Sequence, residues 1–143
     1  MNGFTFAFED YTDENLTTEI DGKDMAELWK IADPINYIDQ LATIPKYVVV
    51  SSNDEFMSMD WTNIYWNKFG GEKHLSIMPN TEHSMATGMY EAVSLISTYL
   101  RSVAAGKTDR PRFDYTYDNV TGEITLTVPK DQVQPTTIEL RHT

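Results

Sequence analysis

The spacing of hydrophobic positions predicts alternating helices and strands between residues 33 and 106. Asp33 and Pro34 are expected to start a helix as its N-cap and first residue. The run 46–50 is apolar and β-branched, which is typical of a strand buried on both faces of a parallel sheet. A second short strand is predicted over 75–78. Each strand is followed by a polar stretch of the kind that forms turns.

Three further helix starts are predicted from capping residues. Asp24, with Glu27 as its reciprocal partner, is expected to cap one helix, Asp60 a second and Ser84 a third. The third helix should end at Gly106 and carries an apolar stripe of Met85, Met89, Ala92, Val93, Ile96, Leu100 and Val103. The order helix, strand, helix, strand, helix favours an α/β fold, a parallel sheet with covering helices. The first 23 residues are aromatic, acidic and aperiodic, and we expect a loop or lid there.

Beyond residue 106 the hydrophobic period changes from helical to alternating. Residues 107–111 resemble a linker, and apolar positions then alternate over 113–117 and 124–128, on either side of a turn at 119–122. Ile138 and Leu140 suggest a third strand. The sequence therefore predicts two parts, 1–106 and 107–143, the second being a small antiparallel β tail.

Composition excludes several classes of function. The 143 residues include 22 acidic and 11 basic side chains, a formal net charge of −11, which argues against nucleic-acid binding and anionic membrane surfaces. No apolar run is long enough to span a bilayer, and the N-terminus is not a signal peptide. Sequons at Asn15 and Asn119 are weak signs of a secreted protein. The chain has no cysteine, and its three histidines match no ligand spacing, so we expect neither a metal nor a cofactor.

Two polar residues follow the two predicted strands at the edge where parallel sheets place ligands and catalysts. Asp54 follows the first strand and His83 the second. Taken singly, the aspartate fits a turn residue and the histidine a surface loop residue better than a catalytic role. Together they have the order in which α/β-hydrolases place the acid and the base of their triad. The neighbouring Glu55 and Glu82 are interpreted as solvated charges.

No serine in the chain fits the nucleophile of such a triad. The nucleophile elbow, G-x-S-x-G, needs glycines on both sides of the serine because the turn is too tight for side chains. The seven glycines stand at positions 3, 22, 70, 71, 88, 106 and 122, and no two are four residues apart. The chain thus carries an acid and a base without a nucleophile.

Short motifs along the chain resemble those of the PhoPQ-activated pathogenicity-related protein family. They are GFTFAF at 3–8, DY at 10–11, ADP at 32–34, IPK at 44–46, NDEF at 53–56, YW at 65–66, GEK at 71–73 and PNTEHS at 79–84. The resemblance implies that 1–106 is a lid and the C-terminal portion of an α/β-hydrolase, and that 107–143 is a linker with a partial β-sandwich-like tail. It also implies that Asp54 and His83 are the triad acid and base, that the serine lies just upstream, and that the chain is truncated at both ends.

Two positions depart from the family pattern. Asn53 stands where the family usually has glycine, although asparagine tolerates a left-handed backbone better than most residues. Met57 replaces a usual aromatic residue, which would reshape the wall of a pocket.

Two functional hypotheses follow from the sequence. In the first, the intact protein is a serine hydrolase or peptidase-like enzyme acting on a peptide or ester, and this chain alone is inactive. In the second, it is a secreted signalling or binding protein that uses the hydrolase fold as an interaction surface. In both, the apolar sheet edge beside Val48 is expected to be open, so the chain should self-associate or bind a partner chain there.

Overall fold

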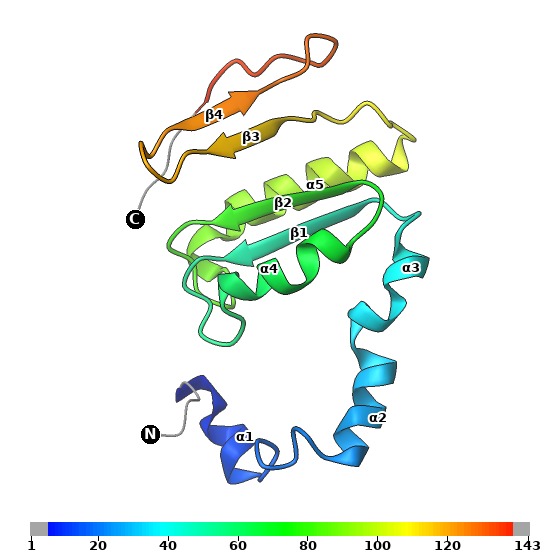
Figure 1. Cartoon of the computed structure of the whole chain (residues 1–143), viewed down its shortest axis with the longest axis vertical. Helices are drawn as coiled ribbons and strands as arrows, with labels where there is room; N and C mark the ends of the chain where they lie inside the picture. The colour runs from blue at the N-terminus through cyan, green and yellow to red at the C-terminus, as the bar shows by residue number, and fades with distance from the viewer. Residues whose placement is uncertain (1–5, 139–143) are drawn as a thin grey trace. The chain divides into compact units, whose positions relative to one another are not determined.

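The computed structural model describes residues 6–138 (Figure 1). The chain forms two compact units, with the boundary between Ile96 and Ser97. It has mixed α/β structure, with a small parallel sheet in the first unit and a small antiparallel sheet in the second.

The first unit begins with short helical segments where the sequence predicted a loop or lid. They are the 3₁₀ turn η1 (Phe6–Phe8) and α1 (Glu9–Asp13). The helix predicted after them is present as α2 (Lys23–Ala32). The prediction that Asp24 caps α2 is wrong. Gly22 occupies the N-cap position and makes no side-chain cap, while Asp24 lies inside the first turn. Glu27 instead pairs with Lys30 at 2.7 Å, one turn along the exposed face.

The predicted helix start at Asp33 and Pro34 is confirmed. The Asp33 carboxylate accepts a hydrogen bond of 2.9 Å from the Ile35 N–H, and Pro34 is the first residue of the 3₁₀ turn η2 (Pro34–Tyr37). The short helix α3 (Ile38–Leu41) follows directly. Side-chain capping and a fixed proline φ together explain why this boundary could be predicted from local sequence.

The parallel strand pair is confirmed. Strand β1 (Lys46–Ser51) pairs in parallel with β2 (Lys73–Met78), in a register that runs from Lys46 opposite Lys73 to Ser51 opposite Met78. The connection contains η3 (Met59–Trp61), α4 (Thr62–Tyr65) and η4 (Trp66–Lys68). The predicted helix cap at Asp60 is wrong, because the Ser58 hydroxyl accepts the Asp60 N–H at 3.4 Å.

Lysines at the start of both strands fix the segments that precede them. Lys46 Nζ donates to the carbonyls of Leu41 and Ile44, both at 2.7 Å. Lys73 Nζ donates to the carbonyls of Trp66 and Phe69 at 2.6 and 3.0 Å. A cation at the C-terminal end of a helical turn satisfies free carbonyls and interacts favourably with the helix dipole. These contacts set where each strand begins.

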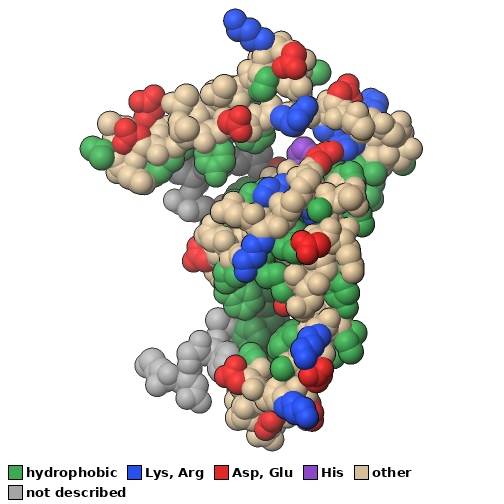
Figure 2. Space-filling model, turned by 45° about the vertical axis from the view of Figure 1, so that its right-hand side comes forward, with side chains coloured by type: hydrophobic (Ala, Val, Ile, Leu, Met, Phe, Trp, Pro, Cys, Tyr) green, Lys and Arg blue, Asp and Glu red, His purple; other side chains and the backbone are tan. Residues whose placement is uncertain are grey.

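The expectation that β1 is buried on both faces is wrong for this structure. Every residue of β1 except Ser51 is half-buried, and Met78 and Ala92 are the buried hydrophobic residues in the part of the chain described. Many large hydrophobic side chains reach the surface instead, as the green areas of Figure 2 show. Two strands offer little area for burial, and a pair of this size is marginally stable alone.

Helix α5 (Met89–Ala104) begins later than predicted. The 3₁₀ turn η5 (Ala86–Gly88) comes first, and Met85 has a left-handed backbone with φ of 55°, so the chain cannot run as one helix from Ser84. The predicted end is confirmed, because Gly106 has φ of +64° and its N–H donates to the Val103 carbonyl at 2.9 Å. With the bond from the Lys107 N–H to the Ser102 carbonyl at 3.0 Å, this forms a Schellman motif.

The second unit contains the predicted β-hairpin. Strand β3 (Asp114–Tyr117) pairs antiparallel with β4 (Ile124–Thr127). In the turn between them, the Asp118 carboxylate accepts the N–H groups of Val120 and Thr121 at 2.7 and 3.1 Å. The suggested third strand, at Ile138 and Leu140, falls largely outside the described residues.

Candidate acid–base site

Hydrogen bonds join the two loops that follow β1 and β2. The Ser52 N–H donates to the Met78 carbonyl and the Asn53 N–H to the Thr81 carbonyl, both at 3.0 Å. In the opposite direction, the Asn80 N–H donates to the Ser52 hydroxyl at 2.8 Å. These bonds continue the parallel ladder beyond the strands. They hold the residues after Ser52 beside the residues after Asn80.

Asp54 is fixed by its own local turn. One carboxylate oxygen, Oδ1, accepts the N–H groups of Phe56 and Met57 at 2.9 and 2.8 Å. This Asx-type turn orients the carboxylate without help from the second loop. The Asp54 side chain is only 10% exposed. The orientation of the acid is therefore supported within its own loop.

The two residues singled out from the sequence lie in direct contact. Nδ1 of His83 lies 3.0 Å from both Oδ1 and Oδ2 of Asp54. An ionised carboxylate can only accept, so Nδ1 carries the hydrogen and donates it. In the neutral imidazole the lone pair is then on Nε2, the atom on the far side of the ring. The His83 side chain is 46% exposed.

Hydrogen bonding lowers the pKa of Asp54 below its ordinary value. Partial burial opposes this and raises the pKa, but the N–H of Met57, the His83 ring and the N–H of Phe56 each stabilise the charged form. The carboxylate is thus ionised at neutral pH. That state is the one which fixes the His83 tautomer.

Glu82, interpreted from the sequence as a solvated charge, has a structural role in the loop that carries His83. Its Oε1 accepts the Ser84 hydroxyl at 2.6 Å and the Ala86 N–H at 2.8 Å. Its Oε2 accepts the Thr87 hydroxyl at 2.8 Å. The bond from Ser84 is the largest of the effects that lower the pKa of Glu82 from 4.5 to about 2. A carboxylate just before a helical N-terminus was a signal that could have revealed this role.

The Glu82 contacts predict how the loop responds to acid. The pKa is lower in the folded loop than in an unfolded chain, so the stabilising contribution is complete above pH 4.5 and is lost as the pH falls through about 2. We expect an NMR titration of the Glu82 carboxyl to have its midpoint near pH 2. Ser84→Ala should move that midpoint upward, towards 4.5. A midpoint unchanged by Ser84→Ala would contradict the assigned cause.

Aromatic rings lie against the imidazole. The Phe56 ring centroid is 4.8 Å from that of His83, and Phe8 lies 5.8 Å from Phe56. Tyr11 is 5.5 Å from Phe8. The segment expected to be a lid therefore contributes Phe8 and Tyr11 to an aromatic wall beside the base. This wall was not predicted from the sequence, because it depends on contacts between distant residues.

The two departures from the family pattern have separate outcomes. A left-handed residue occurs at Asn80, with φ of 55°, and Asn53 is not among the residues with positive φ. Asn53 therefore does not adopt the left-handed backbone for which glycine would be needed. Met57 is 60% exposed and donates its N–H to Asp54.

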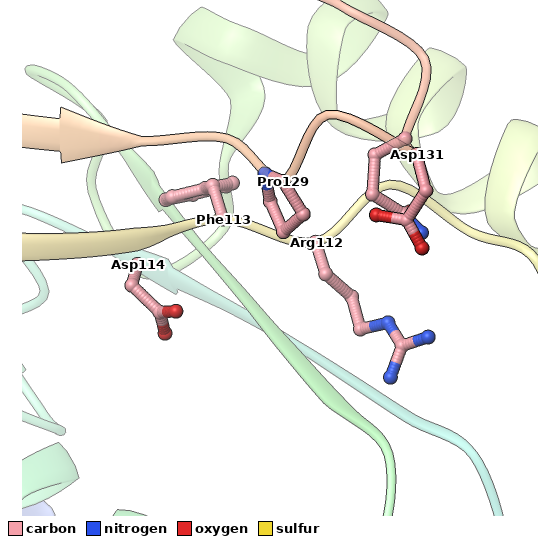
Figure 3. A pocket seen from close by; sticks show the side chains of 6 residues that line it. Arg112, Phe113, Asp114, Pro129 and Asp131 are labelled. Carbon is pink, nitrogen blue, oxygen red and sulfur yellow. The ribbon is translucent and has the colours of Figure 1, made fainter.

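The described residues give little support for a ligand pocket, a metal site or a membrane span. A hollow of about 290 Å³ in the second unit is lined by Arg112, Phe113, Asp114, Pro129, Asp131 and Gln132 (Figure 3). It contains neither Asp54 nor His83. No group of metal-ligating side chains occurs between residues 6 and 138. Over the same range, no helix has the length and hydropathy needed to cross a membrane.

Fold and site together define a mixed α/β protein with a paired carboxylate and imidazole after two parallel strands. The family model of the PhoPQ-activated pathogenicity-related proteins matches residues 3–142. The chain therefore belongs to this family, as the motifs indicated. It is also 36% identical over 140 residues to autocrine proliferation repressor protein A of Dictyostelium discoideum. No solved structure matches.

The match to the Dictyostelium protein covers 92% of this chain and 28% of that relative. The chain thus spans little more than a quarter of the length of the curated relative it matches.

Proposed function

We propose that this chain supplies the acid and the base of a serine-hydrolase-like triad. The observation that carries the proposal is the contact of His83 Nδ1 with both carboxylate oxygens of Asp54 at 3.0 Å. This contact leaves the basic lone pair on Nε2, on an imidazole that is nearly half exposed. The nucleophile belongs to a segment other than residues 6–138.

In this proposal His83 acts as general base and then as general acid. Nε2 takes the proton of a serine hydroxyl as the oxygen attacks an ester or peptide carbonyl, and Asp54 stabilises the imidazolium. The same proton then passes to the leaving group. Asp54 itself stays ionised, in keeping with its lowered pKa. The chain's own residues thus orient the base and move the proton.

The α/β-hydrolase fold is part of the same proposal. In such folds the acid and the base follow successive parallel strands, in that order along the chain. Here Asp54 follows β1 and His83 follows β2, with α4 in the connection. Parallel sheets are usually buried on both faces, so the half-buried β1 is better suited to a larger sheet than to a pair. Additional strands beside β1, together with their covering helices, would supply the missing burial.

A fluorophosphonate that labels activated serines tests this function. The 143-residue chain alone should remain unlabelled, because an acid and a base need a nucleophile to activate. A longer polypeptide that joins this chain to a family segment with a G-x-S-x-G elbow should be labelled on one serine. Intact-mass measurement reads both outcomes. Stoichiometric labelling of the 143-residue chain alone would refute the assignment.

A binding or signalling role is the second candidate. The Dictyostelium relative is named as a proliferation repressor, not as a hydrolase. The chain also exposes large apolar side chains, which mark interaction surfaces in soluble proteins. The labelling experiment separates the two candidates. A longer polypeptide that binds its partners but stays unlabelled would favour the binding role.

A further inference from the structure

The backbone N–H of His83 is bound by a side chain to which none of the sequence motifs gave a role. Oε2 of Glu55 accepts the backbone N–H of His83 at 3.1 Å. Glu55 directly follows Asp54, so two neighbouring acids reach the same histidine, one through its ring and one through its backbone. Glu55 was expected to be a solvated charge, and this contact corrects that interpretation.

Bonds at Asn80, Thr81 and Glu82 hold the loop on either side of His83, and the bond to Glu55 is the one made by the His83 N–H itself. His83 lies outside every helix and strand, between two left-handed residues, Asn80 and Met85, both with φ of 55°. Its side chain is 46% exposed, so the Asp54 carboxylate and the Phe56 ring contact only part of it. A ring without a fixed backbone would not keep Nδ1 within reach of both oxygens of Asp54.

We propose that Glu55 is a positioning residue that holds the main chain of His83 so that its ring meets Asp54. That Glu55 positions a catalytic base rests on the proposed triad. That Glu55 holds the His83 backbone near Asp54 does not depend on the triad. The His83 N–H requires an acceptor oxygen on a side chain as long as that of Glu55. Its negative charge is secondary, since a backbone N–H is neutral and needs only an oxygen lone pair.

Three substitutions separate the effects of the acceptor oxygen, the side-chain length and the negative charge of Glu55. Glu55→Gln keeps an acceptor oxygen at the same reach and removes the charge. Glu55→Asp keeps the charge but shortens the side chain by one methylene, and Glu55→Ala removes the acceptor. The readout is the ratio of the two neutral tautomers of His83, measured by ¹⁵N NMR of the ring nitrogens. His74, whose Nε2 lies 2.8 Å from Glu72, reports on the fold of β2 in every variant.

In the unsubstituted chain we expect the tautomer with hydrogen on Nδ1 to dominate. Glu55→Ala and Glu55→Asp should lower the ratio of this tautomer to the other roughly threefold or more, because the hydrogen bond that holds the His83 N–H is lost. Glu55→Gln should keep the ratio near that of the unsubstituted chain. The His74 signals should not change.

The results also distinguish this inference from the proposed function. If Glu55→Ala or Glu55→Asp leaves the His83 ratio unchanged, Glu55 does not position the base. If the unsubstituted chain already carries its hydrogen on Nε2, the proposed base is wrong, whatever the variants do. Glu55→Asp is the milder change, and it keeps the test decisive if Glu55→Ala alters the His74 signals.

Discussion

Asp54→Asn should lower kcat for ester hydrolysis by roughly 10⁴-fold in a polypeptide that combines this chain with a serine nucleophile. The amide oxygen would keep the bonds from the N–H groups of Phe56 and Met57, as Oδ1 does now. The NH₂ group would then replace Oδ2, which lies 3.0 Å from Nδ1 of His83. With hydrogen on Nδ1, the ring would face this donor and keep only the amide oxygen, also at 3.0 Å, as its acceptor. An Nδ1 without hydrogen could accept from the NH₂ group, so the tautomer with hydrogen on Nε2 gains population. That tautomer has no lone pair with which to accept the serine proton.

The matched control is Asp60→Asn, which makes the same change at an exposed residue in the next turn of the chain. It should leave kcat within about twofold, since surface charges at a distance contribute little. Rates are compared at saturating substrate, so that kcat and not KM is read. A loss of less than tenfold for Asp54→Asn would mean that Asp54 does not set the tautomer of the base.

Gly71→Ala should destabilise the first unit by more than about 3 kcal/mol. Gly71 has φ of +71°, where a Cβ is strained. An added Cβ would also lie 2.0 Å from the carbonyl oxygen of Ala42, a backbone atom that can move only if the main chain shifts. Gly71 and Ala42 lie near the starts of the two parallel strands, so the clash would push the strand ends apart. Urea unfolding followed by circular dichroism measures the loss.

Substitutions at two other glycines separate the backbone strain from the clash with Ala42. Gly106→Ala has the same kind of backbone, with φ of +64°, but nothing within 4 Å of the new Cβ. It should cost only the strain, about 1 kcal/mol. Gly70→Ala places its Cβ 3.4 Å from that of Ala42, an ordinary contact, and should be nearly neutral. Equal losses for Gly71→Ala and Gly106→Ala would rule out the clash with Ala42.

Local sequence determined those elements whose signals lie within a few residues. The run 46–50 gave a strand, Asp33 and Pro34 gave a helix start, and Gly106 gave a helix end. The order of Asp54 and His83 after successive strands gave a pair that the structure brings within 3.0 Å. These predictions succeed because strand propensity, capping and the parallel pairing of consecutive strands are local or nearly local properties.

Tertiary structure decided which side chains serve the site. Glu55 and Glu82 look like solvated acids in sequence, yet one holds the His83 backbone and the other orders its loop. Phe8 reaches the site from 48 positions before Phe56 in the chain, a contact that no periodicity encodes. The helix expected to start at Ser84 begins at Met89, because the Glu82 contacts and the left-handed Met85 give the intervening residues another structure. Capping alternatives of similar energy compete within this loop, whereas the bond from the His83 N–H to Glu55 forms only when the two loops meet.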